Sequence, residues 1–158
     1  MLIKPMTSES FHEYANVVRH SFATVAEEFG YTDSPEFTTN ITNELLAEKT
    51  INGYYPFGAC VDGELVGFVS IIDKGDRAYE MAKLTVLPEF RHLGYGKALL
   101  DFCKQKVREL GGRKIIINLM EDDMRLKNWY LANGFVHKSV TMYAHIPFLI
   151  GCMEWLEE

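Results

Sequence analysis

The sequence predicts a single α/β domain over residues 1–158, with a mixed central sheet of about seven strands and about four helices in the order βααβββαβαββ. Three observations support this fold class. Apolar residues recur at helical spacing early in the chain and change to strand spacing from Tyr55 onwards. Turn residues then separate three successive strands. An amphipathic helix leads from the third strand to another apolar strand, as in a parallel crossover.

The first part of the chain predicts one strand followed by two helices. A short strand at residues 2–6 precedes residues 7–10, which are placed to cap the first helix, and this helix ends at Gly30. Its apolar positions are Phe11, Tyr14, Val17, Val18, Phe22 and Val25. A second helix is expected from Ser34-Pro35-Glu36, where a capping residue precedes a proline, through Leu46.

Strands are expected next at residues 56–61, 65–72 and 77–87. Asp62-Gly63 is a favoured tight hairpin turn, and residues 74–76 form a second turn. The three strands therefore form an antiparallel meander.

The last part of the chain predicts a helix, a strand, a second helix and two more strands. Residues 94–110 form the amphipathic helix, and residues 114–119 are a continuous apolar run, which is typical of a strand buried on both faces. A short helix near residues 123–132 is followed by strands near residues 135–143 and 149–156.

Composition excludes several classes of function. The chain is 47% apolar and 24% charged, which is ordinary for a folded globular protein. Its net charge of −6 argues against non-specific nucleic-acid binding, which requires Lys and Arg to neutralise phosphates. No segment approaches a membrane span and no basic, apolar leader is present, so we expect a cytoplasmic protein without membrane contact. Cys60, Cys103 and Cys152 lack zinc-site spacing, and we expect them to be reduced packing residues with no metal site.

The chemistry is concentrated in residues 84–98, which run from a strand through a loop with Gly94 and Gly96 into a helix. Glycines allow several backbone N–H groups to converge, and a helix N-terminus carries about half a positive charge, so this segment suits a phosphate. Arg91 and Lys97 supply cations beside it. The spacing excludes a P-loop because Arg91 replaces a required glycine, and it fits a dinucleotide-binding fingerprint poorly.

Arg91-His92-Leu93-Gly94-Tyr95-Gly96 resembles the acetyl-coenzyme A signature of the GNAT superfamily of N-acetyltransferases, Arg/Gln-x-x-Gly-x-Gly/Ala. Residues 128–135, in which Trp129-Tyr130 precede Gly134-Phe135, look like the family's later signature, and the order of elements is similar along nearly the whole chain. The resemblance implies the GNAT fold and acetyl-coenzyme A as cosubstrate. It also implies transfer of the acetyl group to a primary amine of an unidentified small molecule or protein, by direct attack in a ternary complex.

The resemblance also implies which residues bind the cofactor. The backbone at residues 84–86 would hydrogen-bond the pantetheine arm, with the Val86 amide as donor to the thioester oxygen. The amides of residues 91–97 would hold the pyrophosphate, and Asn118 and Lys127 would lie on the cofactor's far side. The full set is Leu84, Thr85, Val86, Arg91, His92, Leu93, Gly94, Tyr95, Gly96, Lys97, Asn118 and Lys127.

Tyr130 matches the family's usual general acid. The leaving thiolate must gain a proton, and a phenol with an unperturbed pKa near ~10 can donate one to a thiolate of pKa near ~8.5 if it is held close to the sulfur. The alternative is that Tyr130 only packs beside Trp129 and Phe135.

Glu80 is the candidate general base, because an alkylammonium must lose a proton before it can attack. It lies on the strand leading to Val86 and shares that residue's strand parity unless a bulge intervenes. Alternatively, Glu80 is only a solvent-facing carboxylate on the strand, and a chain of water molecules serves as the base. Asp123 stands where many family members have Asn, and we interpret it as a helix cap.

The sequence leaves the acceptor open. Glu27, Glu28, Asp33 and Glu36 could attract a polycation or form a solvated surface. A non-catalytic acyl-coenzyme A sensor is the alternative function, and a structural interaction domain is a third. A homodimer is also left open.

Overall fold

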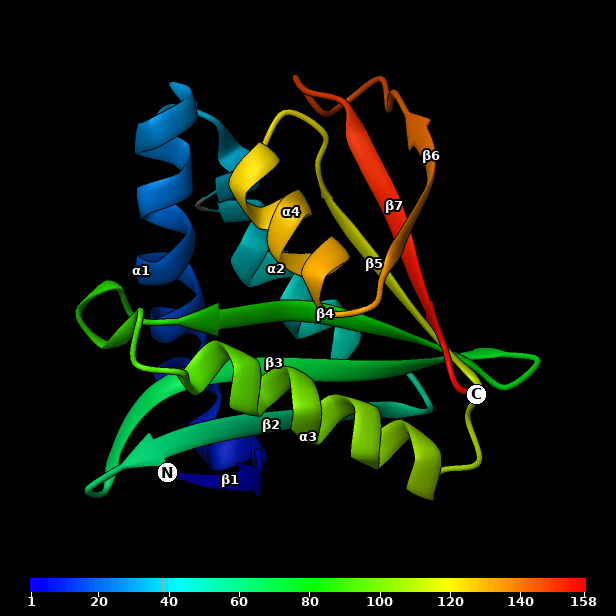
Figure 1. The fold of residues 1–158 in the computed structure, drawn as a ribbon. Coiled ribbons are helices and arrows are strands. Elements are labelled where there is room, and N and C mark those ends of the chain that lie inside the picture. Colours follow the sequence, from blue (N-terminus) through cyan, green and yellow to red (C-terminus); the bar gives the residue numbers. More distant parts are fainter. Residues whose placement is uncertain (38) are drawn as a thin grey trace.

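The computed structural model describes residues 1–37 and 39–158. Seven strands form one sheet in the order β1-β2-β3-β4-β5-β7-β6, and helices cover both of its faces (Figure 1). The order of helices and strands is the predicted one, with three short 3₁₀ turns added.

The first helix ends where the sequence predicts, but the second begins later. Strand β1 (Leu2–Pro5) and turn η1 (Ser8–Ser10) precede α1 (Phe11–Phe29), which ends at Gly30 in the left-handed region, with φ of 80°. Neither Thr7 nor Ser10 makes a side-chain capping bond. At the expected helix start, Pro35–Phe37 form turn η2, and the Ser34 hydroxyl donates to the Glu36 carboxylate. Helix α2 spans Thr39–Glu48.

Strands β2 (Tyr54–Val61), β3 (Glu64–Gly75) and β4 (Ala78–Val86) form the predicted antiparallel meander. Asp62 and Gly63 both have positive φ, 51° and 81°, as a tight hairpin turn requires. The second turn lies later than expected, at Asp76 and Arg77, because Gly75 still pairs with Ala78.

Strand β4 carries a bulge at Lys83, whose φ is 56°. Ser70 pairs with Ala82 and Phe68 pairs with Thr85, so three steps along β4 match two steps along β3. The extra residue reverses the face on which the following side chains lie. Turn η3 (Pro88–Phe90) then leads through a loop to α3 (Tyr95–Glu109).

Strand β5 (Lys114–Met120) runs parallel to β4 but pairs with it only between residues 78–80 and 114–116. Beyond that point the two strands spread apart (Figure 1). Helix α4 (Met124–Ala132), edge strand β6 (Val136–Thr141) and β7 (Ile150–Leu156) follow, and β7 pairs with β5 along its whole length. The expectation that β5 is buried on both faces is wrong. Ile116 is half-buried and Asn118 is exposed, because α1 packs on β3 and β4 rather than on β5.

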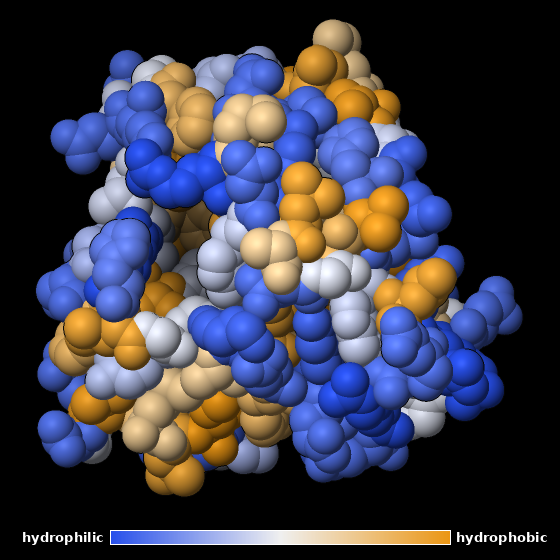
Figure 2. All heavy atoms as spheres, viewed as in Figure 1, coloured by the Kyte–Doolittle hydropathy of each residue, from blue (hydrophilic) through white to orange (hydrophobic). Residues whose placement is uncertain are grey.

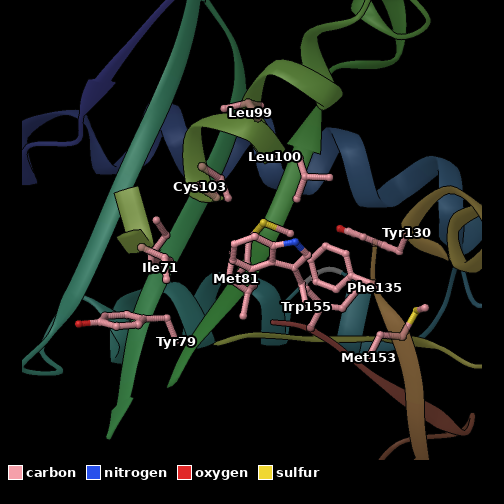
Figure 3. Close-up of a cluster of buried hydrophobic side chains, with 14 of the residues drawn as sticks. Ile71, Tyr79, Met81, Leu99, Leu100, Cys103, Tyr130, Phe135, Met153 and Trp155 are labelled. Carbon is pink, nitrogen blue, oxygen red and sulfur yellow. The ribbon is translucent and has the colours of Figure 1, made fainter. Parts of the chain in front are cut away.

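Two hydrophobic clusters fix the sheet, one on each face. The first joins α3 and α4 to the sheet, and Figure 3 shows Leu100 and Cys103 of α3 facing Met81 and Tyr130. The second joins α1 and α2 to the other face. Cys60 and Cys103 are buried as expected, and Cys152 is half-buried. None of the helices described is both long enough and apolar enough to cross a membrane.

Candidate functional site

The end of β4 presents unpaired backbone groups to the gap beside β5. Among the residues described, no register pair joins β4 to β5 beyond Glu80. The Leu87 N–H donates to the Val66 carbonyl at 2.8 Å. Bonded and non-bonded pairs alternate in an antiparallel ladder, so the N–H and C=O of Val86 point away from β3. The Val86 carbonyl accordingly accepts from Arg91 Nε at 3.0 Å. The Val86 N–H therefore faces the side from which β5 has diverged, and Figure 2 shows the surface hollowed nearby, between α1 and α4.

The loop after β4 turns sharply into α3. His92 and Gly94 have positive φ, 63° and 87°, and Gly94 is the N-cap residue. The first helical bond runs from Ala98 N–H to the Gly94 carbonyl at 3.1 Å, and no side chain caps the helix. The N–H groups of residues 95–97 therefore lack a helical partner. Helix α4 differs, because its N-cap Asp123 accepts from the Leu126 N–H at 3.1 Å; this confirms the predicted cap.

Gly94 and Gly96 leave open space beside these N–H groups. A Cβ at either position would meet no atom within 4 Å. The positive φ of Gly94 explains a glycine there. Gly96 has no such constraint, and a glycine inside a helix costs about 1 kcal/mol relative to alanine. Neither backbone nor packing explains Gly96, whereas an anion approaching the helix N-terminus does.

The Arg91 side chain makes three hydrogen bonds within the protein, so it is not the free cation expected from the sequence beside the loop. Its Nη1 donates to Thr24 Oγ1 and its Nη2 to the Ser21 carbonyl, both at 2.8 Å. With the bond to Val86, each of the three guanidinium nitrogens donates one hydrogen bond within the protein. Burial lowers the pKa of Arg91, but a guanidinium keeps its charge. Arg91 therefore ties α1 to the end of β4.

The two lysines expected at the cofactor are also paired, but to different extents. Lys97 Nζ lies 2.5 Å from Asp101 Oδ1 in an exposed pair on α3, which water and a phosphate can displace. Lys127 Nζ lies 2.5 Å from Glu121 Oε1 and only 12% of its side chain is exposed. Glu121 also contacts His137 Nε2 at 2.9 Å, and the bonds from Lys127 and His137 lower the pKa of this carboxyl. Lys127 thus anchors α4 to the end of β5.

Tyr130 lies in the last turn of α4 and is only 6% exposed. Its ring packs edge-on against Trp129 and Phe135, at centroid distances of 5.0 and 5.2 Å, and its hydroxyl points toward α3 (Figure 3). Burial, with a smaller contribution from Cys103, raises the pKa of this phenol above its ordinary value. The hydroxyl therefore stays protonated at neutral pH, as an acid must, although burial makes proton release more costly.

Glu80 lies on the opposite face of the sheet from Tyr130. Its neighbours Tyr79 and Met81 belong to the cluster under α3, so Glu80 faces the α2 side. The expected shared parity with Val86 is wrong, because the bulge at Lys83 intervenes. Glu80 Oε2 lies 3.5 Å from Lys74 Nζ, and Glu80 Oε1 accepts from Asn118 Nδ2 at 3.4 Å.

The structure thus brings Glu80 and Asn118 together at the point where β4 and β5 part. Beyond this point β4 and β5 no longer pair, so groups from both faces of the sheet can approach the gap between them. Sequence reasoning missed Lys83, whose ammonium lies 2.9 Å from Glu44. The available signal was the four-residue spacing of Glu44 and Glu48, which places two carboxylates on one helix face.

Comparisons with known proteins agree on one family. A family model described as "Acetyltransferase (GNAT) family" matches residues 19–135. An uncharacterized N-acetyltransferase of Lactobacillus delbrueckii subsp. lactis is 25% identical over 94% of this chain and 89% of its own length.

Solved structures show the same fold. The PaiA N-acetyltransferase of Thermoplasma acidophilum, crystallised with coenzyme A, has a TM-score of 0.77 at 19% identity, and the match covers 99% of each chain. An aminoglycoside 6'-N-acetyltransferase, also in complex with coenzyme A, has a TM-score of 0.72 at 16% identity, over 99% of this chain and 97% of the other.

Proposed function

The chain belongs to the GNAT family of acetyltransferases, and from this premise we propose that it transfers the acetyl group of acetyl-coenzyme A to a primary amine by direct attack in a ternary complex. The observation that carries the proposal is the uncapped start of α3 with open space over Gly96, together with the outward-facing N–H of Val86 at the end of β4. These backbone groups suit a ligand with a pyrophosphate at one end and a thioester at the other.

The chain offers donors along such a ligand. The N–H groups of residues 95–97 and the positive end of α3 would hold the pyrophosphate, with Lys97 released from its exposed pair. The backbone of residues 84–86 would bond the pantetheine arm as a neighbouring strand would, because β5 leaves this edge unpaired. The Val86 N–H would donate to the thioester oxygen, where negative charge develops during attack.

Proton transfer is assigned to Glu80 and Tyr130. Glu80 would take the proton of the attacking amine, directly or through water, from the α2 side of the gap. Tyr130 would donate its hydroxyl proton to the departing thiolate from the α4 side. The two groups would therefore act on opposite sides of the reacting carbon.

Gly96 provides the sharpest test of the cofactor site. We expect Gly96→Val to weaken acetyl-coenzyme A binding at least tenfold, measured by calorimetry, because its branched side chain fills the space that a phosphate needs. Gly96→Ala is the matched control: it should raise the free energy of unfolding by up to about 1 kcal/mol, and the family signature admits alanine at this position. Unchanged affinity in a folded Gly96→Val variant would contradict the site.

Turnover separates an enzyme from a sensor. The parent protein should release coenzyme A from acetyl-coenzyme A faster when a panel of primary amines, including diamines and lysine peptides, is added. Tight binding of acetyl-coenzyme A without amine-dependent turnover across the panel would favour the non-catalytic sensor instead.

A further inference from the structure

We propose that Lys83, held between Glu44 and Glu48 of α2, is a positioning residue that fixes the β4 bulge and thereby aims the backbone of residues 84–86 at the thioester. The inference rests on the proposed function, because it concerns the same backbone. It adds a connection that neither the family signature nor the cofactor loop contains: a helix on the far face of the sheet holds the reacting strand in register.

The bulge places Lys83 in a backbone conformation that needs support. Its φ of 56° lies in the left-handed region, which costs residues other than glycine roughly 1–2 kcal/mol. Most such positions carry glycine, asparagine or aspartate, so the backbone alone does not favour lysine here. The contacts of the side chain must therefore explain why lysine occurs at this position.

The Lys83 side chain is largely buried in an ion-pair cluster. Only 17% of it is exposed, and Nζ lies 2.9 Å from Glu44 Oε2 and 3.9 Å from Glu48 Oε1. Glu44 and Glu48 are one helical turn apart, so their charges repel unless a cation lies between them. Lys83 is therefore the cation that allows both carboxylates on this face of α2.

Glu48 depends on Lys83 more than Glu44 does. Its side chain is 15% exposed, and its Oε2 is buried without a hydrogen-bond partner among the residues described. Burial raises the pKa of Glu48, and the charge of Lys83 opposes this shift. Glu44 is exposed and can be solvated instead. Removing the Lys83 charge thus leaves a buried carboxyl without its counter-ion, which is a costly change.

The bulge determines where the Val86 N–H points. Without the extra residue, the register after Ala82 would shift by one. A shift by one exchanges the residues whose N–H groups bond β3 with those whose N–H groups point away. The Val86 N–H would then turn toward β3 and be lost to the thioester. Even a displacement of about 1 Å at a reacting centre can cost on the order of 10²-fold in rate.

The test compares kcat with cofactor affinity in Lys83→Met, Lys83→Arg and a control. Lys83→Met should lower kcat by about 10–100-fold. Its dissociation constant for coenzyme A should rise by a smaller factor than kcat falls, because the α3 loop would still hold the pyrophosphate. Lys83→Arg should restore most of kcat because it keeps the cation. Lys106→Met, which removes an ordinary surface pair with Glu109 at 3.7 Å, should leave both quantities unchanged.

Two further variants keep the test decisive if Lys83→Met does not fold. Lys83→Gln removes the charge but keeps an amide that can donate a hydrogen bond to Glu48, so it should fold more readily than Lys83→Met and show a similar fall in kcat. The triple variant, which adds Glu44→Gln and Glu48→Gln to Lys83→Met, should have a kcat less than about threefold below that of Lys83→Met. The ion-pair cluster is already broken in Lys83→Met. Normal kcat in folded Lys83→Met or Lys83→Gln, with an active parent, overturns this inference alone. A parent that neither binds acetyl-coenzyme A nor turns it over overturns the proposed function and this inference with it.

Discussion

Arg91→Met is expected to weaken the fold much more than it weakens cofactor binding. The guanidinium donates to the Val86 carbonyl, the Ser21 carbonyl and Thr24 Oγ1, at 2.8 to 3.0 Å. Hydrogen bonds of a charged donor each contribute about 1.5–3 kcal/mol, but three bonds of one half-exposed group are not additive. Water can also reach the stranded carbonyls. We therefore expect the free energy of unfolding to fall by about 2–4 kcal/mol.

Denaturant unfolding followed by circular dichroism measures this loss, and calorimetry measures coenzyme A affinity in the same samples. Lys97→Met is the matched control, since its exposed pair with Asp101 contributes at most about 1 kcal/mol to stability. Lys97→Met should instead reduce coenzyme A affinity and weaken its salt dependence, whereas Arg91→Met should leave that salt dependence intact. Parent-like stability in Arg91→Met together with a tenfold weaker, less salt-dependent affinity would refute the structural role and restore Arg91 as a phosphate ligand.

Three further predictions concern Tyr130 and Glu80, the proposed proton-transfer residues. Tyr130→Phe should bind acetyl-coenzyme A like the parent but turn over about 10²–10⁴-fold more slowly, and the defect should shrink for a thioester of a more acidic thiol; an unchanged steady-state rate would contradict the acid role. Glu80→Gln should lower the rate more at neutral than at high pH, where free amine is abundant, and a parallel loss at every pH would indicate positioning instead. Because burial raises the folded-state pKa of Tyr130 above its ordinary value of 10.0, its contribution to stability is present below pH 10 and is lost as pH rises further. Urea unfolding from pH 9 to 11.5 should therefore show a flatter decline for Tyr130→Phe than for the parent, and equal slopes would contradict the burial effect.

The element order and the glycine-bearing loop between β4 and α3 could be predicted because their signals are local. Asp62-Gly63 specifies a hairpin by its backbone preference, and Gly30 specifies a helix end. The glycine pair at Gly94 and Gly96 lies where a strand gives way to a helix, and the structure leaves both positions open. Such features depend on a few neighbouring residues, so the sequence alone contains them.

The partners of charged side chains could not be predicted, because they are distant in sequence. Arg91 bonds residues 67 and 70 positions away, and no spacing rule connects them. The bulge at Lys83 is likewise invisible in the strand pattern, since lysine is an unusual left-handed residue. One missed residue then changed the expected face of Glu80 relative to Val86. The exposure of one face of β5 was not predicted for a related reason. A run of apolar residues predicts a strand, but it does not show which helix packs on that strand.

The separation of Glu80 and Tyr130 on the two faces of the sheet has a consequence for inhibitor design. An amine and a thioester that meet in the gap between β4 and β5 would enter from different sides, so neither would block the other's path. An amine can be joined to the sulfur of coenzyme A through a short acetyl-derived bridge. Such a molecule would pass through the gap between β4 and β5 and contact both faces of the sheet. Once the coenzyme A part is bound, the amine part binds within the same complex and loses little further entropy. Such a conjugate should therefore bind more tightly than coenzyme A alone, by a factor on the order of 10² or greater.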